Sequence, residues 1–112
     1  MIRITLFKNG SDKCYGFKLL GHAGYAESGE DIVCSAVSAL TINTINAIET
    51  FTEDDFSISQ DEETGMIEFM MAADPLNRSS DSQLLLDTLV LGLSSIEEQY
   101  SEFIQLEFEI SI

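Results

Sequence analysis

The single histidine of this chain, His22, lies twelve residues before Cys34, one of only two cysteines. A cysteine thiolate is a strong nucleophile, and an imidazole within reach can take its proton and later protonate a leaving group. A glycine-containing loop is predicted between the two residues, and a helix is predicted to begin just before Cys34. These two side chains are the minimum that catalysis by a cysteine nucleophile requires.

The residues before Cys34 predict how its thiol would be activated. Asp is a preferred N-cap, so Asp31 is predicted to cap a helix that runs to about Thr50. Cys34 would then be the third residue inside the helix, among the free N–H groups of the first turn. These groups would lower the thiol pKa from its usual value of about 8.5. They could also bind the oxyanion of a tetrahedral intermediate.

Other residues of the segment have predicted supporting roles. Ser38 lies one helical turn beyond Cys34 on the same face, where it could hydrogen-bond His22 or line the site. The alternative is a helix serine bonded back to a preceding carbonyl, which is an equally common arrangement. The backbone freedom of Gly21, Gly24 and Gly29 would let the intervening loop open and close over a substrate.

Each residue also has an ordinary structural explanation. A single His at a strand end is usually solvated or hydrogen-bonded, and a single Cys in an apolar helix usually fills the core. A metal site with His22, Cys34 and nearby carboxylates as ligands is a further option, although no second His and no Cys-x-x-Cys spacing supports zinc. The occurrence of His22 and Cys34 around one glycine-containing loop favours catalysis without a metal or cofactor.

Seven elements are predicted to position these residues. Alternating apolar residues indicate strands, and apolar stripes at helical spacing indicate helices. The predicted ranges are strands 2–8 and 14–20, a helix 31–50, strands 56–60 and 66–72, a helix 80–99 and a strand 103–110. This β-β-α-β-β-α-β order predicts an α+β two-layer sandwich, with a mostly antiparallel sheet and two helices on one face. The 112 residues suffice for one domain, residues 1–112.

Residues outside the segment are predicted to be structural. The second helix is too rich in leucine for a one-sided surface helix, which predicts a central position or an interface. Cys14 is predicted to be a core residue of a strand. The acid clusters 53–55 and 61–63 are predicted to be solvated turns.

The charge is strongly acidic, with 20 acidic and 5 basic residues and a net charge of −15. Residues 1–18 carry a net +3, whereas residues 19–112 carry only Arg78 against nineteen acids. Such a surface repels nucleic acids and anionic membranes and attracts basic partners, although solubility alone would also explain it.

The sequence also predicts a cytoplasmic location. No signal peptide is expected, and no run is expected to be long enough to span a bilayer. With two cysteines in a reducing compartment, a structural Cys14–Cys34 disulfide is not expected.

The segment resembles the signature of the Prp family, the ribosomal-processing cysteine proteases of bacteria. The matching residues are Gly21-His22-Ala23 and Gly29-x-Asp31-Ile32-Val33-Cys34-Ser35-Ala36-Val37-Ser38. The resemblance covers the whole chain in length and element order. It implies Cys34 as nucleophile and His22 as base, with Asp31 and Ser38 at signature positions.

The resemblance also implies a substrate and an assembly state. It implies a cytoplasmic, homodimeric endopeptidase that removes the N-terminal extension of a large-subunit ribosomal protein, the L27 protein, during ribosome assembly. Cleavage is expected after aromatic residues and before a small residue and a Lys-rich stretch. Tyr25 would help form the apolar pocket for the aromatic side chains, unless it is simply exposed.

A second class of function remains open from the sequence. The acidic charge and the apolar second helix are also typical of a non-catalytic adaptor that binds a basic ribosomal protein. Such an adaptor would bind in a salt-sensitive way and form no product. A peptidase would release a peptide in a reaction that depends on Cys34.

Overall fold

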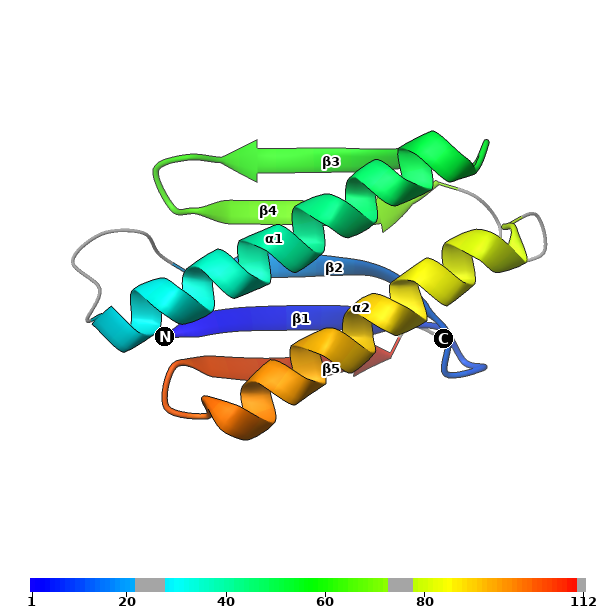
Figure 1. Cartoon of the computed structure of the whole chain (residues 1–112). Helices are drawn as coiled ribbons and strands as arrows, with labels where there is room; N and C mark the ends of the chain where they lie inside the picture. The colour runs from blue at the N-terminus through cyan, green and yellow to red at the C-terminus, as the bar shows by residue number, and fades with distance from the viewer. Residues whose placement is uncertain (22–27, 73–77, 111–112) are drawn as a thin grey trace.

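The computed structural model, which describes residues 1–21, 28–72 and 78–110, contains a five-stranded sheet with two helices on one face (Figure 1). The elements are β1 (Ile2–Lys8), β2 (Cys14–Leu20), α1 (Ser28–Phe51), β3 (Phe56–Asp61), β4 (Met66–Met71), α2 (Ser80–Gln99) and β5 (Ile104–Ile110). The predicted α+β sandwich and its element order are confirmed. The largest difference is the start of α1, which lies three residues before Asp31.

The sheet has the strand order β3-β4-β2-β1-β5. The pairs β1–β2, β2–β4 and β3–β4 are antiparallel, and only β1–β5 is parallel. In that parallel pair Ile2 lies opposite Ile104, and the Ile2 amide donates a 2.8 Å hydrogen bond to the carbonyl of Phe103. The first strand therefore lies inside the sheet, between the second strand and the last.

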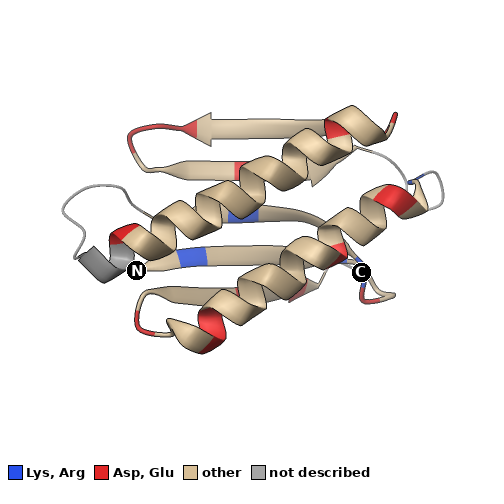
Figure 2. Cartoon of the chain, viewed as in Figure 1, with Lys and Arg blue, Asp and Glu red and all other residues tan. Residues whose placement is uncertain are grey.

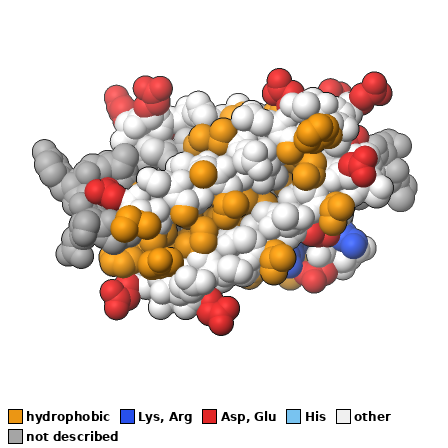
Figure 3. Space-filling model, in the orientation of Figure 1, with side chains coloured by type: hydrophobic (Ala, Val, Ile, Leu, Met, Phe, Trp, Pro, Cys, Tyr) orange, Lys and Arg blue, Asp and Glu red, His pale blue; other side chains and the backbone are white. Residues whose placement is uncertain are grey.

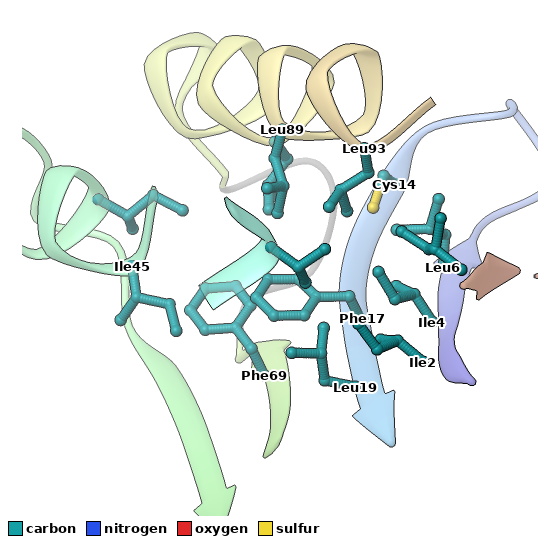
Figure 4. Close-up of a cluster of buried hydrophobic side chains, with 14 of the residues drawn as sticks. Ile2, Ile4, Leu6, Cys14, Phe17, Leu19, Ile45, Phe69, Leu89 and Leu93 are labelled. Carbon is teal, nitrogen blue, oxygen red and sulfur yellow. The ribbon is translucent and has the colours of Figure 1, made fainter. Parts of the chain in front are cut away.

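The core lies between the sheet and the helices (Figure 4). Successive side chains of a strand point to opposite faces, so burial of Ile2, Ile4 and Leu6 places Arg3 and Thr5 on the face away from the helices. The Phe17 and Phe69 rings stack at the centre of the core, with centroids 5.2 Å apart. The helices complete the core with Val33, Val37, Ile45 and Ile48 of α1 and Leu86, Leu89 and Leu93 of α2.

The second helix lies on the sheet beside α1 and not in a central position, so that part of the prediction is wrong. Leu86, Leu89 and Leu93 face the core and Leu85 packs against its edge, which leaves Leu84 and Leu91 uncovered. Leu84 and Leu91 are 65% and 68% exposed. Figure 3 shows hydrophobic side chains gathered in a band across this helical face.

Among the described residues, one stretch, Asp31–Phe51 of α1, is long and apolar enough in composition to cross a membrane. The expectation that no run would reach this length is therefore wrong. A helix that packs in a protein core can meet the same criterion, and α1 buries Val33 and Ile48 against the sheet.

The end of the sheet where α2 begins is held by a connected set of hydrogen bonds, and we call it the cap end. Asp54 accepts hydrogen bonds from the Ser79 amide (3.0 Å) and the Ser79 hydroxyl (2.6 Å). The Ser79 oxygen in turn accepts from the Ser82 amide at 3.1 Å and so caps α2. The prediction that the acids 53–55 are solvated turn residues is therefore wrong for Asp54, which links the end of α1 to the start of α2.

Candidate active site

A cavity of about 550 Å³ lies at the opposite end of the sheet, which we call the cavity end. Its walls come from the first turns of α1, the end of β2 and the beginnings of β1 and β4. The lining of this cavity includes four residues that the sequence analysis proposed for the site: Gly21, Asp31, Cys34 and Ser38. The described part of the predicted site therefore converges on one cavity.

Helix geometry explains why three of these residues share the cavity. An α-helix turns once every 3.6 residues, so Asp31, Cys34 and Ser38, spaced by three and four, lie on one face. Val33 and Val37, on the adjoining face, are each 1% exposed and anchor α1 to the sheet. The apolar stripe thus fixes the rotation of α1 that turns Cys34 toward the cavity.

The start of α1 corrects the predicted activation of Cys34. The helix begins at Ser28, so Asp31 does not cap it and Cys34 lies six residues after its first residue. The free N–H groups of the helix start therefore belong to the turn before Cys34. Asp31 lies instead in the first turn, where the helix dipole favours a carboxylate. The dipole effect falls off within one turn, so its contribution to the thiolate is smaller than predicted.

Gly21 closes the sheet side of the cavity and has a conformation that requires glycine. Its φ angle is +143°. A Cβ atom there would lie 3.0 Å from the Ile2 Cα and 3.0 Å from the Met1 carbonyl oxygen. The backbone of β2 therefore passes close to the beginning of β1, immediately before His22 in the sequence.

The two cysteines have different surroundings. Cys34 is half-buried at the cavity, whereas Cys14 is only 2% exposed in the core. The Cys14 thiol donates a 3.3 Å hydrogen bond to the Gly16 carbonyl, and burial raises the pKa of this thiol. Cys14 therefore has the environment of an inert structural cysteine.

Other predicted site residues are placed differently or not described. Gly29 was predicted in the flexible loop, but it is the second residue of α1, so that prediction is wrong. His22, Gly24 and Tyr25 lie outside the described residues. Among the side chains that the structure describes, no three of His, Cys, Asp or Glu are grouped so that they could hold a metal ion.

Sequence reasoning missed the sheet residues that form the apolar part of the cavity. Leu19 of β2 and Ile67 of β4 line it, together with Ile2 of β1. Leu19 and Ile67 are paired across the antiparallel β2–β4 ladder, so they lie side by side below the helix. The strand pattern marked these positions as apolar, but only the strand order shows that they meet beside Cys34.

Comparison with known proteins identifies this arrangement. The family model for the cysteine protease Prp matches residues 1–105. The ribosomal processing cysteine protease Prp of Staphylococcus aureus is 33% identical over 109 residues, which are 97% of this chain and 100% of the relative. The Bacillus subtilis protein of the same name is 30% identical over 112 residues, covering 98% and 99% of the two chains.

Solved structures agree with the sequence relatives. The S. aureus Prp protease in complex with a substrate peptide has a TM-score of 0.88 at 32% identity, covering 97% of this chain and 100% of that chain. The same protease with a covalently linked product peptide has a TM-score of 0.84. SMU.848 from Streptococcus mutans has a TM-score of 0.89 at 29% identity, covering 99% of each chain.

The fold and these matches define a cysteine protease. The chain belongs to the Prp family of ribosomal processing cysteine proteases.

Proposed function

We propose that the chain removes the N-terminal extension of a large-subunit ribosomal protein, the L27 protein, with Cys34 as nucleophile and His22 as general base and acid. The observation that carries the proposal is the position of Cys34, half-buried on a cavity of about 550 Å³ in a chain of the Prp family. The covalently linked product peptide in the S. aureus relative supports covalent catalysis in this chain.

The first half of the reaction transfers the acyl group to the enzyme. His22 takes the proton of the Cys34 thiol, and the thiolate attacks the scissile carbonyl carbon. The carbonyl π electrons move onto oxygen, and they return as the C–N bond breaks. His22 donates its proton to the departing amine, which leaves a thioester on Cys34.

The second half releases the extension. A water molecule gives a proton to His22 and attacks the thioester carbonyl. The tetrahedral intermediate collapses, the C–S bond breaks, and the thiolate of Cys34 is restored. The overall products are a carboxylic acid and an amine, and the reaction needs no metal or redox cofactor.

The lining of the cavity supports recognition of an apolar side chain next to the scissile bond. Leu19 and Ile67 present aliphatic carbon to the cavity, and burial of an aromatic ring against such a surface is favourable. The net charge of −15 supports binding of a basic ribosomal protein. Membership of a protease family favours this role over the non-catalytic adaptor.

Mass spectrometry of the chain incubated with the extended L27 protein tests the proposal. We expect a shortened L27 protein and a released peptide, with loss of cleavage by at least about a thousandfold in Cys34→Ala and a large loss in His22→Ala. Cys14→Ala is the matched control, because it removes the other thiol outside the cavity and should retain cleavage whenever it folds. Wild-type rates in both Cys34→Ala and His22→Ala would contradict the dyad, and binding without any product would favour the adaptor.

We also propose a cytoplasmic homodimer. The exposed Leu84 and Leu91 of α2 and the half-exposed Ile42 of α1 support an interface on the helical face. Light scattering after size-exclusion chromatography should give twice the 12.4 kDa chain mass. Leu91→Glu should shift this species toward the monomer, whereas a wild-type monomer would contradict the dimer.

A further inference from the structure

The β1–β2 turn contains the dipeptide Asn9-Gly10, which is capable of an intramolecular reaction. Figure 2 shows this turn, with its acidic residue, at the end of the sheet where α2 begins. The side-chain carbonyl carbon of an Asn can be attacked by the amide nitrogen of the next residue, which closes a cyclic succinimide. Glycine favours this attack because it has no side chain to obstruct it. The surroundings of Gly10 are open as well, since a Cβ atom there would meet no heavy atom within 4 Å.

Two backbone amides hold the carbonyl group that would be attacked. The Asn9 Oδ1 atom accepts a hydrogen bond from the Ser11 amide at 2.9 Å and another from the Lys13 amide at 3.1 Å. When the Gly10 nitrogen attacks Asn9 Cγ, negative charge develops on this same oxygen. Two N–H groups directed at an atom that becomes anionic have the arrangement of an oxyanion hole, which stabilises such an intermediate.

Further contacts hold the turn in one conformation. Asp12 has a φ angle of +63°, and its amide donates a 3.0 Å hydrogen bond to the Asn9 carbonyl. The Asn9 amide donates a 3.0 Å hydrogen bond to the Lys13 carbonyl, and Lys8 Nζ lies 3.2 Å from an Asp12 carboxylate oxygen. The two amide donors are therefore preorganised in the folded chain, whereas an unfolded chain directs them at Asn9 Oδ1 only part of the time.

We propose that Asn9 is a site of spontaneous deamidation and that the folded turn accelerates the reaction. The Gly10 nitrogen loses its proton and bonds to Asn9 Cγ, and the side-chain NH₂ group takes up a proton and leaves as ammonia. Water then opens the succinimide. Cleavage of the bond from the Gly10 nitrogen to Cγ gives aspartate, and cleavage of its bond to the main-chain carbonyl carbon gives isoaspartate. Overall the reaction consumes water, releases ammonia and involves no residue of the Cys34 cavity.

The two products have different structural consequences. Aspartate keeps the length of the backbone, and its carboxylate can accept the same two amide hydrogen bonds, which are stronger to a charged acceptor. Isoaspartate instead adds a methylene group to the main chain between β1 and β2. Asn9 and Lys13 line a cavity of about 420 Å³ together with Arg78 at the start of α2, and Arg78 bonds the carbonyl of Cys14, the residue after Lys13. Isoaspartate should therefore weaken the cap end.

A comparison of folded and unfolded chains tests the acceleration. The folded protein, the protein in guanidinium chloride and a peptide of residues 5–13 are kept in mildly alkaline buffer, and peptide mapping follows the loss of Asn9. We expect the folded protein to convert about tenfold faster than the peptide, because two hydrogen bonds strengthen as their acceptor becomes charged. Labelling with isoaspartyl methyltransferase identifies isoaspartate. Asn43 and Asn46 of α1 are internal controls and should remain intact.

Variants at Ser11 test the role of the amide donors. Ser11→Pro removes the N–H group that bonds Asn9 Oδ1 and should slow conversion in the folded protein by about threefold, the share of one of the two hydrogen bonds. Ser11→Ala is the matched control, because it keeps this N–H group and should convert at the wild-type rate. In urea unfolding, Asn9→Asp should have at least the wild-type midpoint, and chains enriched in isoaspartate should have a lower one.

Two results would overturn the proposal. One is conversion of the folded protein at or below the rate of the peptide, and the other is equal conversion in Ser11→Pro and Ser11→Ala. If Ser11→Pro does not fold, the comparison of the wild-type protein with the peptide still decides. Equal urea midpoints for chains with isoaspartate and with Asn9 would contradict the weakening of the cap end. None of these measurements involves cleavage of a substrate, so they are independent of the proposed peptidase function.

Discussion

The polar side chains are bonded to one another at one end of the sheet and exposed at the other. At the cap end, Asp54, Ser79 and Ser82 bond to one another, and Arg78 and Gln83 both bond the Cys14 carbonyl. At the cavity end, Asp31 is exposed at the cavity that holds Cys34, and Asp61 and Glu62 are exposed at the nearby β3–β4 turn. Helix termini and strand termini form both ends of the sheet, so the two ends differ in their side chains and not in the kind of element that forms them.

The cap end therefore contributes chiefly to the stability of the fold, and the cavity end chiefly to catalysis. Hydrogen bonds that join distant elements stabilise the cap end, since each provides a partner for a polar group that loses its bonds to water on folding. The cavity end retains a thiol and carboxylates that an incoming peptide can contact. Removal of a polar side chain at the cap end should therefore change the free energy of unfolding, and removal of a polar or thiol side chain at the cavity end should chiefly change kcat/KM.

The largest expected difference is between the two thiols. Cys34 borders the cavity, whereas Cys14 is 2% exposed with a pKa raised by burial. We expect iodoacetamide to modify Cys34 at least about a hundredfold faster, because Cys14 reacts only after the core opens. Peptide mapping of timed samples measures both rates. Equal labelling in the folded protein would contradict the assignment, and equal labelling in denaturant is the control.

Gly21 is the backbone position at the cavity end with the greatest expected sensitivity. Gly21→Ala should destabilise the protein by about 1–3 kcal/mol, because φ is +143° and the new Cβ would lie 3.0 Å from the Met1 carbonyl oxygen. It should also lower kcat/KM at temperatures where the variant is folded. Gly10→Ala is the matched control, because a Cβ at Gly10 meets no heavy atom within 4 Å. Urea unfolding curves that are equal for the two variants would contradict this reading.

Removal of the Asp54 carboxylate should affect stability and spare catalysis. Asp54→Ala loses the 2.6 Å hydrogen bond from Ser79 and should lower the free energy of unfolding by about 1–2 kcal/mol. The kcat/KM of the folded fraction should remain at the wild-type value. A large loss of kcat/KM with unchanged stability would break the distinction between the two ends.

The same carboxylate predicts a pH dependence. The Ser79 hydroxyl is the largest cause that lowers the pKa of Asp54 below its ordinary value. The stabilisation is therefore complete above the unfolded-state pKa of about 3.9 and is lost as pH falls through the lower folded-state pKa. Urea unfolding of the wild type and Asp54→Asn should give a stability difference at pH 7 that shrinks below about pH 4. A difference that stays constant down to pH 2 would show that ionisation is not involved.

The smallest effect is expected at Asp31. Because α1 begins before it, Asp31→Asn should change the free energy of unfolding by only a few tenths of a kcal/mol, through the helix dipole. A loss of about 1 kcal/mol in Asp31→Ala would instead indicate the N-cap that the sequence predicted. Thermal unfolding at matched ionic strength distinguishes these values.

Much of the fold could be predicted because its signals are local. The alternation Ile2, Ile4, Leu6 and the Asn9-Gly10 turn predict the first hairpin, and β1 and β2 have the predicted bounds. The stripe through Val33 and Val37 predicts which face of α1 is buried. The grouping of Asp31, Cys34 and Ser38 on one helical face also follows from spacing alone.

The remaining features depend on tertiary contacts. Nothing near Asp54 in the sequence indicates its partner, because Ser79 lies 25 residues away. The pairing of Leu19 with Ile67, which brings both side chains to the cavity beside Cys34, requires the order of the strands. The start of α1 was misplaced because both Ser28 and Asp31 are of residue types that favour helix N-termini, and local preference does not distinguish them.

The parallel pairing of the first and last strands affects the order of events during synthesis. Ile2 lines the cavity, and its amide bonds the carbonyl of Phe103 next to β5. While the C-terminal strand is still inside the translating ribosome, β1 lacks one of its two neighbours and Ile2 lacks this support. We therefore expect a nascent chain to acquire its catalytic shape only after β5 has left the ribosome, because contacts between segments far apart in the sequence form late.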